Sequence, residues 1–562
     1  MTGGGCEARG GAVEFTFEGM TIAAREGENL AAVLAEAGHL VLRSTRKGAA
    51  RGVFCGMGVC RDCLVDIGER RNLRACMTKV EPDMAVRRAG GPGTPVTPRD
   101  APPHVLLDAL GEETPDIFVI GAGPAGMAAA LAARETGARV VLADERARPG
   151  GQFFKQMSSG MPIDSQQAEG RRLVEKVRAS GIELWPETLV WGAFEPLVFA
   201  VNRAGGTTIV RPRAAVYAGG AFERPWPVPG WTLPGVMTTG AAQTMWRTDR
   251  RLPGKRVLIA GNGPLNLQVA TELAAGGADA VAIAESAPVP RSILDAARMG
   301  VSAPNLVLQG LRYLRACRKA GTPLLHGSHL ASVSQTGSRL QAVIAGDHER
   351  VFEVDAVCLG YGFLPSNDLL RAIGARAPFD PAKGHPVVER DTEGATSVAG
   401  LFAAGDCIGL GGARVALADG TIAGAAAARY AGFGTSAAVE RAVRKARAQA
   451  GRHRRFQSAL WSIYTPSVVD APWTADTIIC RCEEMRFGDA LAALDEGQAS
   501  AGAIKRRTRI GMGHCQGRYC GWLLSSLLAQ NGRPGDEYSG FAPRLPAKPV
   551  SIASLSRGPG GQ

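Results

Sequence analysis

The chain of 562 residues is 45% hydrophobic and carries a formal net charge of +12, the composition of an ordinary globular protein with room for about three or four domains. It contains no uninterrupted apolar run of about 18 residues, and its N-terminus, MTGGGCEARG, lacks the apolar core of a signal peptide, so we expect a soluble cytoplasmic protein. A secreted disulfide framework is excluded on the same grounds, and the grouping of the cysteines favours metal ligation instead.

The N-terminal residues, 1–95, are predicted to form a small ferredoxin-like domain. A hairpin is expected over 13–17 and 20–24, and a helix is expected over 29–37. The following residues, 96–115, are rich in Gly and Pro and are predicted to be an extended linker between two formerly separate proteins.

The first cysteine group lies inside this domain, in the order Cys55-x4-Cys60-x2-Cys63-x12-Cys76. This is the plant-type spacing for a 2Fe-2S cluster. Gly56 and Gly58 would let the loop turn tightly and direct its N–H groups at sulfur. Zinc is the alternative metal, although zinc ribbons usually present two CxxC pairs. The stretch resembles the ferredoxin-like β-grasp module of bacterial amino-acid and amine dehydrogenases.

Residues 116–152 are predicted to form a complete nucleotide-binding βαβ unit. An apolar strand over 117–120 runs into a glycine turn and an Ala-rich helix, and a second strand over 140–143 ends at acidic residues. The glycines allow a tight turn, close approach of a pyrophosphate and close packing of helix on strand. Asp144, at the end of the second strand, would repel a 2′-phosphate, which favours binding of FAD or NAD over NADP. The candidate FAD-binding residues are Gly121, Gly123, Gly126, Asp144, Glu145, Gly151 and Gln152.

A second unit of this kind begins at residue 256. Gly261 and Gly263 fit the glycine pattern, and Glu285 ends the following strand, where it would also oppose a 2′-phosphate. The third glycine position holds Asn266, whose side chain is expected to push the helix away from the strand and to alter pyrophosphate binding. Whether this unit binds NAD(H), another adenine nucleotide or nothing stays open.

Residues 400–424 are predicted to form a second FAD-binding segment. An apolar strand over 401–404 is followed by Gly405 and Asp406, and a helix is expected from about residue 413. This stretch resembles the second FAD signature of the pyridine nucleotide-disulfide reductase superfamily, which implies that Asp406 binds the ribityl chain. The start of the helix would direct its positive end at the flavin ring and stabilise reduced, anionic flavin.

Disulfide reduction is rejected, because that chemistry needs a pair of cysteines beside the flavin. The residues directly after Gly151, 152–154, contain no cysteine pair. The second dinucleotide unit, which is inserted into the flavin unit, contains only Cys317. The remaining isolated cysteines are Cys6, Cys358 and Cys407.

The second cysteine group follows a basic, helical connector and comprises Cys480-x-Cys482 and Cys515-x4-Cys520. Its surroundings resemble bacterioferritin-associated ferredoxin-like domains, in which these pairs bind one 2Fe-2S cluster between short helices. Zinc is again the alternative. Basic residues 441–455 are the only stretch that resembles a nucleic-acid-binding face, so we expect no nucleic-acid partner. The last residues, beyond 534, are expected to form a poorly ordered tail.

Nearly the whole chain resembles the iron-sulfur and flavin subunits, here fused, of the opine oxidase, hydrogen cyanide synthase and proline or hydroxyproline dehydrogenase group. The fold class is predicted to be α/β, with two Rossmann-like dinucleotide-binding domains, glutathione reductase-like, between a β-grasp ferredoxin-like domain and a small helical 2Fe-2S domain. The predicted boundaries are 1–95 (ferredoxin-like), 96–115 (linker), 116–250 and 350–435 (FAD-binding), 251–349 (inserted Rossmann domain), 436–475 (connector), 476–535 (second 2Fe-2S domain) and 536–562 (tail).

The resemblance implies the electron-transferring subunit of a heteromeric dehydrogenase, with FAD and two 2Fe-2S clusters. A partner FAD subunit of the amino-acid oxidase type would oxidise the C–N bond of an amino acid, imino acid or opine. This chain would pass the electrons to a quinone or cytochrome, through ferredoxin, flavoprotein and ferredoxin modules that follow one another in line. A peripheral place at the inner face of a membrane, through the partner or acceptor, is compatible with this role.

No catalytic or substrate-contacting residue is identified. An alternative is a self-sufficient NADH-dependent oxidoreductase, in which the inserted domain delivers hydride to FAD and the clusters are the exit. A non-enzymatic alternative is a redox-sensing or iron-delivery module.

Overall fold

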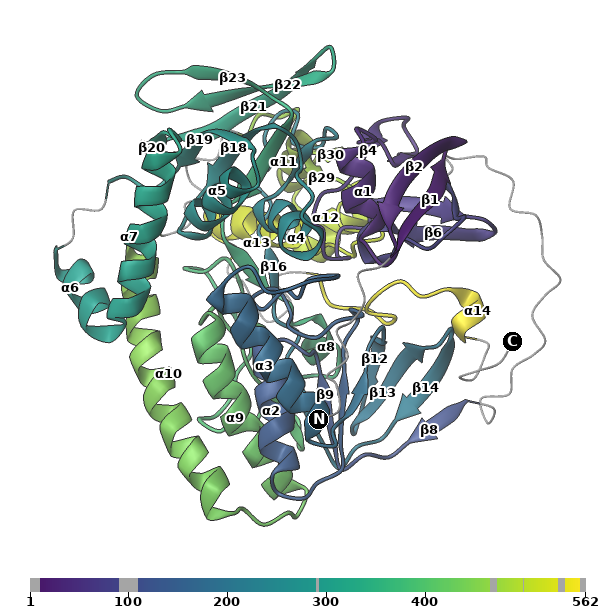
Figure 1. Cartoon of the computed structure of the whole chain (residues 1–562), viewed down its shortest axis with the longest axis vertical. Coiled ribbons are helices and arrows are strands. Elements are labelled where there is room, and N and C mark those ends of the chain that lie inside the picture. The colour runs from purple at the N-terminus through teal and green to yellow at the C-terminus, as the bar shows by residue number, and fades with distance from the viewer. Residues whose placement is uncertain are drawn as a thin grey trace.

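The computed structural model describes residues 11–89, 110–289, 293–464, 473–498, 500–533 and 541–555 (Figure 1). Cys6 and most of the predicted linker lie outside these ranges. The end of that linker contains β8 (Gly111–Glu113), which pairs in parallel with β14 (Gly206–Val210).

The N-terminal domain is a mixed sheet covered by one helix, in the strand order β2-β1-β7-β5-β6. The helix α1 (Leu30–Glu36) is held at its start by Asn29, whose side chain accepts a hydrogen bond from the backbone N–H of Ala32. Its Ala and Leu side chains are buried against the sheet. The strands are β1 (Ala12–Phe17), β2 (Met20–Arg25), β5 (Leu64–Ile67), β6 (Arg70–Arg74) and β7 (Ala85–Arg88), with a short β3 (Arg43–Ser44) and β4 (Ala50–Arg51) pair beside the cysteine loop.

The first dinucleotide-binding unit is a parallel sheet in the order β11-β10-β9-β15-β28. Its central strands are apolar throughout because both of their faces are covered. The strands are β9 (Ile117–Ile120), β10 (Val140–Ala143), β11 (Glu183–Trp185), β15 (Ala214–Tyr217) and β28 (Leu401–Ala403), and the helices are α2 (Pro124–Arg134), α3 (Ser165–Ala179) and α9 (Ala413–Tyr430). A second layer contains β12 (Leu189–Phe194), β13 (Val198–Arg203), β14 and β8.

The inserted unit repeats this plan, with a parallel sheet in the order β17-β24-β18-β19-β20. The strands are β17 (Val236–Thr238), β18 (Arg256–Gly261), β19 (Asp279–Glu285), β20 (Leu324–His326) and β24 (Ala356–Gly360), and the helices are α4 (Thr239–Asp249), α5 (Leu265–Ala275), α6 (Ile293–Ser302) and α7 (Pro304–Lys319). An antiparallel meander of β21 (His329–Thr336), β22 (Arg339–Ala345) and β23 (Arg350–Val354) packs against the inner strands β18, β19 and β24 of this sheet. The predicted α/β fold class with two Rossmann-like units is therefore confirmed.

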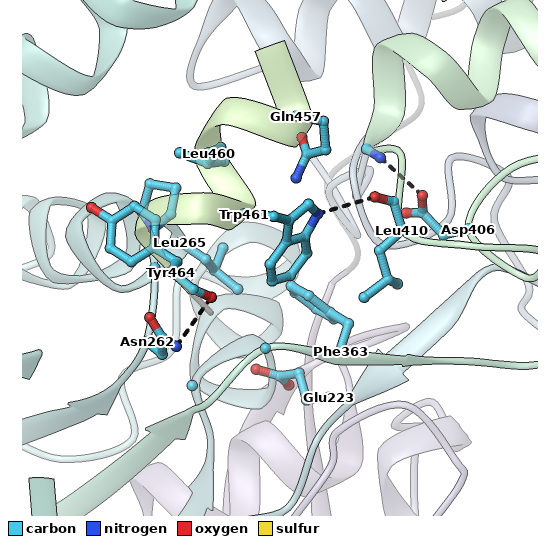
Figure 2. Close-up of a pocket in the computed structure, with 15 residues that line it drawn as sticks. Glu223, Asn262, Leu265, Phe363, Asp406, Leu410, Gln457, Leu460, Trp461 and Tyr464 are labelled. Atoms are coloured by element: carbon cyan, nitrogen blue, oxygen red, sulfur yellow. Dashed lines mark hydrogen bonds between the residues drawn. The ribbon is translucent and has the colours of Figure 1, made fainter. Parts of the chain in front are cut away.

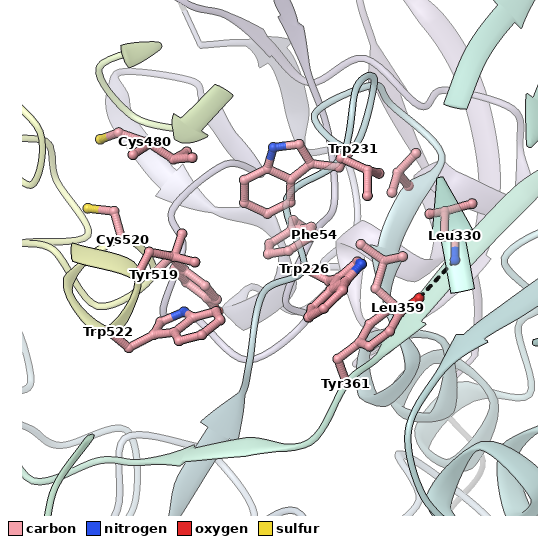
Figure 3. Close-up of a cluster of buried hydrophobic side chains, with 14 of the residues drawn as sticks. Phe54, Trp226, Trp231, Leu330, Leu359, Tyr361, Cys480, Tyr519, Cys520 and Trp522 are labelled. Atoms are coloured by element: carbon pink, nitrogen blue, oxygen red, sulfur yellow. Dashed lines mark hydrogen bonds between the residues drawn. The ribbon is translucent and has the colours of Figure 1, made fainter. Parts of the chain in front are cut away.

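The C-terminal cysteine domain lies directly against the N-terminal one, although they are separated by almost the whole sequence (Figure 1). Helix α10 (Ala437–Ile463) packs along α9 and leads to this domain, whose elements are β29 (Ile478–Cys480), β30 (Met485–Arg486), α11 (Phe487–Asp495), α12 (Ala501–Thr508) and α13 (Gly521–Gln530). One buried apolar cluster contains Phe54 and Cys55 of the N-terminal domain together with Cys480 and Cys520 of the C-terminal domain (Figure 3). The cysteine modules therefore do not stand at opposite ends of the flavin unit, as their order in the chain suggests.

The expected tail has a defined place over its described residues, 541–555. The ring of Phe541 packs where a side chain on Gly517 would lie, with ring carbon Cδ2 only 2.0 Å from the ideal Cβ position. The N–H of Ala547 donates to the carbonyl of Trp191, and the ammonium group of Lys548 pairs with Glu145. This part of the tail differs from the expectation of poor order because its polar and aromatic groups contact the flavin unit and the C-terminal domain.

Among the helices of the described ranges, none combines the length and the apolar character that crossing a membrane requires.

Helices α2 and α9 approach closely because α9 carries glycines at the contact. An ideal Cβ on Gly420 would lie 2.0 Å from the carbonyl oxygen of Ala125, and one on Gly424 would lie 2.1 Å from that of Ala129. Both distances are far shorter than van der Waals contact. The glycines therefore fix the spacing of the helices whose first turns border the predicted FAD site.

We expect Gly420→Ala to destabilise the protein by about 1–3 kcal/mol, the usual cost of overpacking a close contact. The thermal unfolding midpoint should fall, and the FAD content of the purified protein should fall with it. Gly451→Ala is the matched control, because Gly451 lies inside α10 with no atom within 4 Å of its ideal Cβ. A Gly420→Ala protein with the same midpoint and FAD content as the control would contradict this prediction.

Candidate cofactor sites

The first glycine turn forms a cradle that side chains would fill. Gly121 has a φ of +103°, and an ideal Cβ on Gly126 would lie 1.7 Å from the carbonyl oxygen of Gly121. Gly151 approaches the same turn, with its ideal Cβ 2.8 Å from the Cα of Gly123. Helix α2 begins next to Gly123 without a side-chain cap, so its first N–H groups are available to an anion. These features fit the phosphates of a dinucleotide.

Asp144 follows β10 and closes the turn. One carboxylate oxygen accepts from the N–H of Ala122 at 2.6 Å, and the other accepts from the N–H of Arg146 at 2.7 Å. Burial raises the pKa of Asp144. The adjoining turn is joined to the glycine cradle because the N–H of Gly150 donates to the carbonyl of Ala122, and Gln152 lies half-buried in that turn.

Glu145, the neighbouring candidate, takes part in contacts between domains. One of its oxygens pairs with Arg74 of the N-terminal domain, and the other pairs with Lys548. Arg74 also donates to the carbonyl oxygen of Gly58 in the cysteine loop at 3.1 Å. Burial by itself would raise the pKa of Glu145, but the charges of Lys548 and Arg74 outweigh burial and lower the pKa. Glu145 thus links the flavin unit to the first cysteine loop and to the C-terminal segment.

Asp406 organises the loop between β28 and α9. One of its carboxylate oxygens accepts from the N–H groups of Gly411 and Gly412, each at 3.0 Å. Gly405 has a φ of +80°, and its ideal Cβ would lie 2.8 Å from the Cβ of Ala125 in α2. The two predicted FAD signatures are therefore in contact. Burial raises the pKa of Asp406.

A cavity of about 160 Å³ lies between the flavin unit and the inserted unit (Figure 2). Asp406 lines it, together with Glu223, and so do residues of the glycine turn of the inserted unit. Another part of the wall comes from the end of α10, a segment predicted only as a connector, and contains Gln457, Leu460, Trp461 and Tyr464. The indole N–H of Trp461 donates to the carbonyl of Leu410 at 3.3 Å, which holds the helix end in the cleft. The sequence carried no motif for these residues.

Glu223 and Lys155 are buried charged residues that the sequence analysis also missed. The carboxylate of Glu223 accepts from the N–H of Gly240 at 2.7 Å, in the first turn of α4. The ammonium group of Lys155 donates to the side chain of Gln243 at 2.9 Å and to the carbonyl of Gly240 at 3.2 Å. Burial raises the pKa of Glu223 to about 7 and lowers the pKa of Lys155 to about 7. Both groups can therefore exchange a proton near neutral pH.

The glycine turn of the inserted unit is closed by Glu285, which accepts from the N–H of Gly263 at 2.9 Å. Asn266 is buried, and its amide donates to the carbonyl of Gly360 at 3.1 Å. The space for this side chain exists because Gly360 and Gly261 lack side chains; their ideal Cβ atoms would lie 2.0 and 2.6 Å from the amide group. Glycines on the facing strands therefore make room for Asn266. The expectation that this side chain pushes the helix away from the strand did not take these glycines into account.

The first cysteine group is buried and internally bonded. The N–H of Cys60 donates to the sulfur of Cys55 at 3.4 Å, and the N–H of Asp62 donates to the sulfur of Cys60 at the same distance. The side chain of Cys55 hydrogen-bonds with Cys60 and Cys76, and that of Cys76 also with Cys63. The loop turns at Gly56 and Gly58, with φ of +58° and +80°.

The second cysteine group forms two hydrogen-bonded pairs, Cys480 with Cys520 and Cys482 with Cys515. The hydrogen bond with the side chain of Cys520 lowers the pKa of the Cys480 thiol to about 7. An ideal Cβ on Gly513 would lie 2.1 Å from the Cβ of Cys482, so the loop passes directly over a thiol. Across the described ranges, no three or more His, Cys, Asp or Glu side chains surround a single point as one metal ion requires. Buried thiols in linked pairs fit a cluster with two irons, each of which takes two cysteines.

The remaining cysteines of the described ranges, Cys317, Cys358 and Cys407, are buried and do not form disulfides. Cys407 is adjacent to Asp406, and its thiol lies 3.3 Å from the carbonyl oxygen of Ala404.

The sequence matches two protein families. Residues 10–91 match the family described as "2Fe-2S iron-sulfur cluster binding domain". Residues 115–432, more than half of the chain, match the family described as "Pyridine nucleotide-disulphide oxidoreductase". These matches support iron-sulfur and flavin as cofactors.

Several proteins of known name are similar to this chain. The A subunit of opine oxidase from Agrobacterium tumefaciens strain Ach5 is 32% identical over 79% of this chain and 92% of that protein. The HcnB subunit of hydrogen cyanide synthase from Pseudomonas aeruginosa is 30% identical over 78% of this chain and 97% of that protein. The alpha subunit of sarcosine oxidase from Corynebacterium sp. strain P-1 is 27% identical, and the match covers 98% of this chain and 56% of that protein.

The crystal structure of L-proline dehydrogenase from P. horikoshii has the same fold, with a TM-score of 0.71 at 19% identity over 98% of this chain and 99% of that chain. The relatives at 32% and 30% identity confirm the predicted resemblance to the opine oxidase and hydrogen cyanide synthase group. The chain belongs to the pyridine nucleotide-disulphide oxidoreductase family of flavin-dependent enzymes and, within it, to the group that contains the A subunit of opine oxidase and the HcnB subunit of hydrogen cyanide synthase.

Proposed function

We propose that this chain is the electron-transferring FAD and iron-sulfur subunit of a heteromeric dehydrogenase. The complex oxidises the C–N bond of an amino acid, imino acid or opine and passes the electrons to a quinone or cytochrome. The observation that carries the proposal is the position of both buried cysteine groups beside the unit that bears the FAD signatures. When bound, flavin accepts two electrons together and releases them singly, whereas each cluster carries one.

Different residues of this chain are proposed to bind each part of FAD and each iron-sulfur cluster. The glycine cradle holds the pyrophosphate, Asp144 bonds the ribose, and Asp406 bonds the ribityl chain. The full set proposed for FAD is Gly121, Gly123, Gly126, Asp144, Gly151, Gln152, Gly405 and Asp406, with Glu145 as the link to the N-terminal domain. The proposed cluster ligands are Cys55, Cys60, Cys63 and Cys76 for one cluster, and Cys480, Cys482, Cys515 and Cys520 for the other.

The junction of β17 and α4 connects the cavity with the first cysteine loop. On one side, the N–H of Thr238 donates to the carbonyl of Phe54 at 2.9 Å, and the ideal Cβ of Gly56 lies 2.9 Å from the Cα of Ala241. On the other side, Glu223 accepts from Gly240 and lines the cavity. The short span supports transfer of electrons from the flavin side of the cavity to the first cysteine group.

Glu223 is placed to hold a proton at its carboxylate when electrons leave the cavity. Lys155 is the basic group that partners it through Gly240. The end of α10 contributes an aromatic and apolar wall to the same space, through Leu460, Trp461 and Tyr464.

The named relatives are all subunits, which supports a hetero-oligomer. We infer that the partner is an FAD protein of the amino-acid oxidase type that carries the substrate site. An acceptor in the membrane would place the complex at the inner face of that membrane.

Two features oppose the NADH-dependent alternative. Trp461 and Tyr464 line the cleft between the dinucleotide units, and the side-chain amide of Asn262 in the second glycine turn donates to the carbonyl of Tyr464 at 3.3 Å. Nicotinamide that entered from the inserted unit would meet these groups. A non-enzymatic sensor or iron-delivery module is opposed by membership of a family of flavin-dependent enzymes.

We expect Cys60→Ser and Cys515→Ser each to remove about half of the bound iron, because each breaks one of two independent ligand sets. Dye-linked turnover should fall at least about tenfold in each, while the FAD spectrum stays. Cys317→Ser is the control, since this thiol lies outside both groups. Unchanged iron in either variant, or zinc in the wild-type protein, would refute the ligand assignment.

We expect NADH to leave the flavin absorbance unchanged in stopped-flow mixing, because the end of α10 occupies the approach from the inserted unit. The amine substrate should bleach the flavin when the partner subunit is present. Bleaching by NADH at the rate of turnover would instead support the self-sufficient enzyme.

We expect Glu223→Gln to slow dye-linked turnover by about a hundredfold or more, the usual contribution of general acid–base catalysis. The pKa of Glu223 is about 7, so the carboxylate can accept a proton only as the pH rises through 7. Wild-type turnover should therefore rise across this pH, and the variant should show a flatter profile. A variant with the full wild-type profile would exclude the proton-holding role.

A further inference from the structure

The two cysteine groups are joined by a buried ion pair between residues that lie among their ligands. Arg481 stands between Cys480 and Cys482, and Asp62 stands between Cys60 and Cys63. The Nε atom of Arg481 lies 2.8 Å from a carboxylate oxygen of Asp62. The side chains of this pair are 4% and 1% exposed, so water does not screen the interaction.

The surroundings fix both partners. The second oxygen of Asp62 accepts from Arg43 at 2.7 Å, and Arg481 also donates to the carbonyl of Trp231 at 2.7 Å. The guanidinium group of Arg481 lies over the ring of Phe54, 3.9 Å from its centroid. These contacts hold the Arg481 and Asp62 side chains in a fixed position relative to each other.

Aromatic rings lie in the same place. Phe54 precedes Cys55 and Tyr519 precedes Cys520, and their ring centroids are 5.6 Å apart (Figure 3). Residues next to a ligand of each group are thus in van der Waals contact across the domain boundary. A second ion pair, Arg51 with Glu484 at 3.1 Å, joins the same loops.

We propose that Arg481 is a positioning residue shared by both clusters, which sets their reduction potentials together and holds their ligand loops in contact, so that one electron passes directly from one cluster to the other. This inference rests on the proposed function, since it requires a cluster in each cysteine group. The transfer reduces one cluster and oxidises the other by one electron. No bond is made or broken, and no proton or co-reactant is needed.

The direction of the effect follows from charge. Reduction adds a negative charge to a cluster, so a buried positive charge nearby raises its potential and a buried negative charge lowers it. Arg481 and Asp62 lie among ligands of different groups but touch each other. Each charge should therefore act on both clusters, whereas a residue that only fastened the domains together would give no common shift.

The test is a redox titration of the holoprotein monitored by electron paramagnetic resonance. Cys60→Ser and Cys515→Ser proteins, each with one cluster, assign the two signals. We expect Arg481→Met to keep the iron and to shift both potentials downward, and Asp62→Asn to shift both upward. Arg481→Lys, which keeps the charge, should shift them less than Arg481→Met. Arg507→Met is the control, because Arg507 carries the same charge in the same domain but pairs with Glu496 at the surface.

The double variant Arg481→Met with Asp62→Asn distinguishes the effect of charge on the potentials from the effect of the contact that holds the loops together. It removes the contact but leaves the net charge as it was. Both potentials should return toward the wild-type values. Electron exchange between the clusters, followed by rapid mixing and freezing, should stay at least tenfold slower than in the wild type. Should Arg481→Met lose iron, Arg481→Lys and Asp62→Asn carry the test.

Shifts confined to the cluster of the second cysteine group, or absent from both clusters, would overturn the proposal. Wild-type exchange rates in the double variant would overturn the positioning role. Failure of the proposed function is distinguishable from these results, because the wild-type protein would then lack iron in one group before any substitution is made.

Discussion

The structure depends on the pairing of charges at the boundary between the two cysteine domains. Asp62 is 1% exposed, and a buried carboxylate without partners would cost several kcal/mol. Its oxygens are taken by Arg43 from its own domain and by Arg481 from the other end of the chain. The buried charge of Arg481 is compensated by Asp62, so this register of the two domains pairs both charges, and the apolar cluster around Phe54 closes over the contact.

This contact changes how the redox modules are related. Asp62 and Arg481 are 419 positions apart in the sequence, and the flavin unit lies between them. In the structure, Cys55 and Cys60 of the first group share one apolar cluster with the second group, and the flavin-side cavity lies on the other side of the junction between β17 and α4. Glu223 is the side chain that faces the cavity at this junction. The first cysteine loop therefore meets this junction through Phe54, and the pair of Arg481 with Asp62 joins that loop to the second cysteine group.

Segments that carry no motif complete the sites. The end of α10 lines the cavity through Trp461, and Lys548 of the tail pairs with Glu145 beside the first cysteine loop. Both segments lie against surfaces that the dinucleotide units would otherwise expose. A single fused chain can hold such segments in place at lower entropic cost than separate subunits, because its ends are already tethered to the surfaces that they cover.

The sequence by itself determined the local features: the strands and glycine turns of both dinucleotide units, the acids that follow them, and the spacing of the cysteines. These follow from short-range physics, since a glycine with a φ of +103°, as at Gly121, or a strand buried on both faces leaves a direct mark on the residue type. Only the tertiary structure decided that Arg481 meets Asp62, that glycines opposite Asn266 make room for it, and that Glu223 and Trp461 share a cavity. Those pairings join residues distant in sequence, and a buried charge or a missing Cβ can be understood only once its partner across the fold is known.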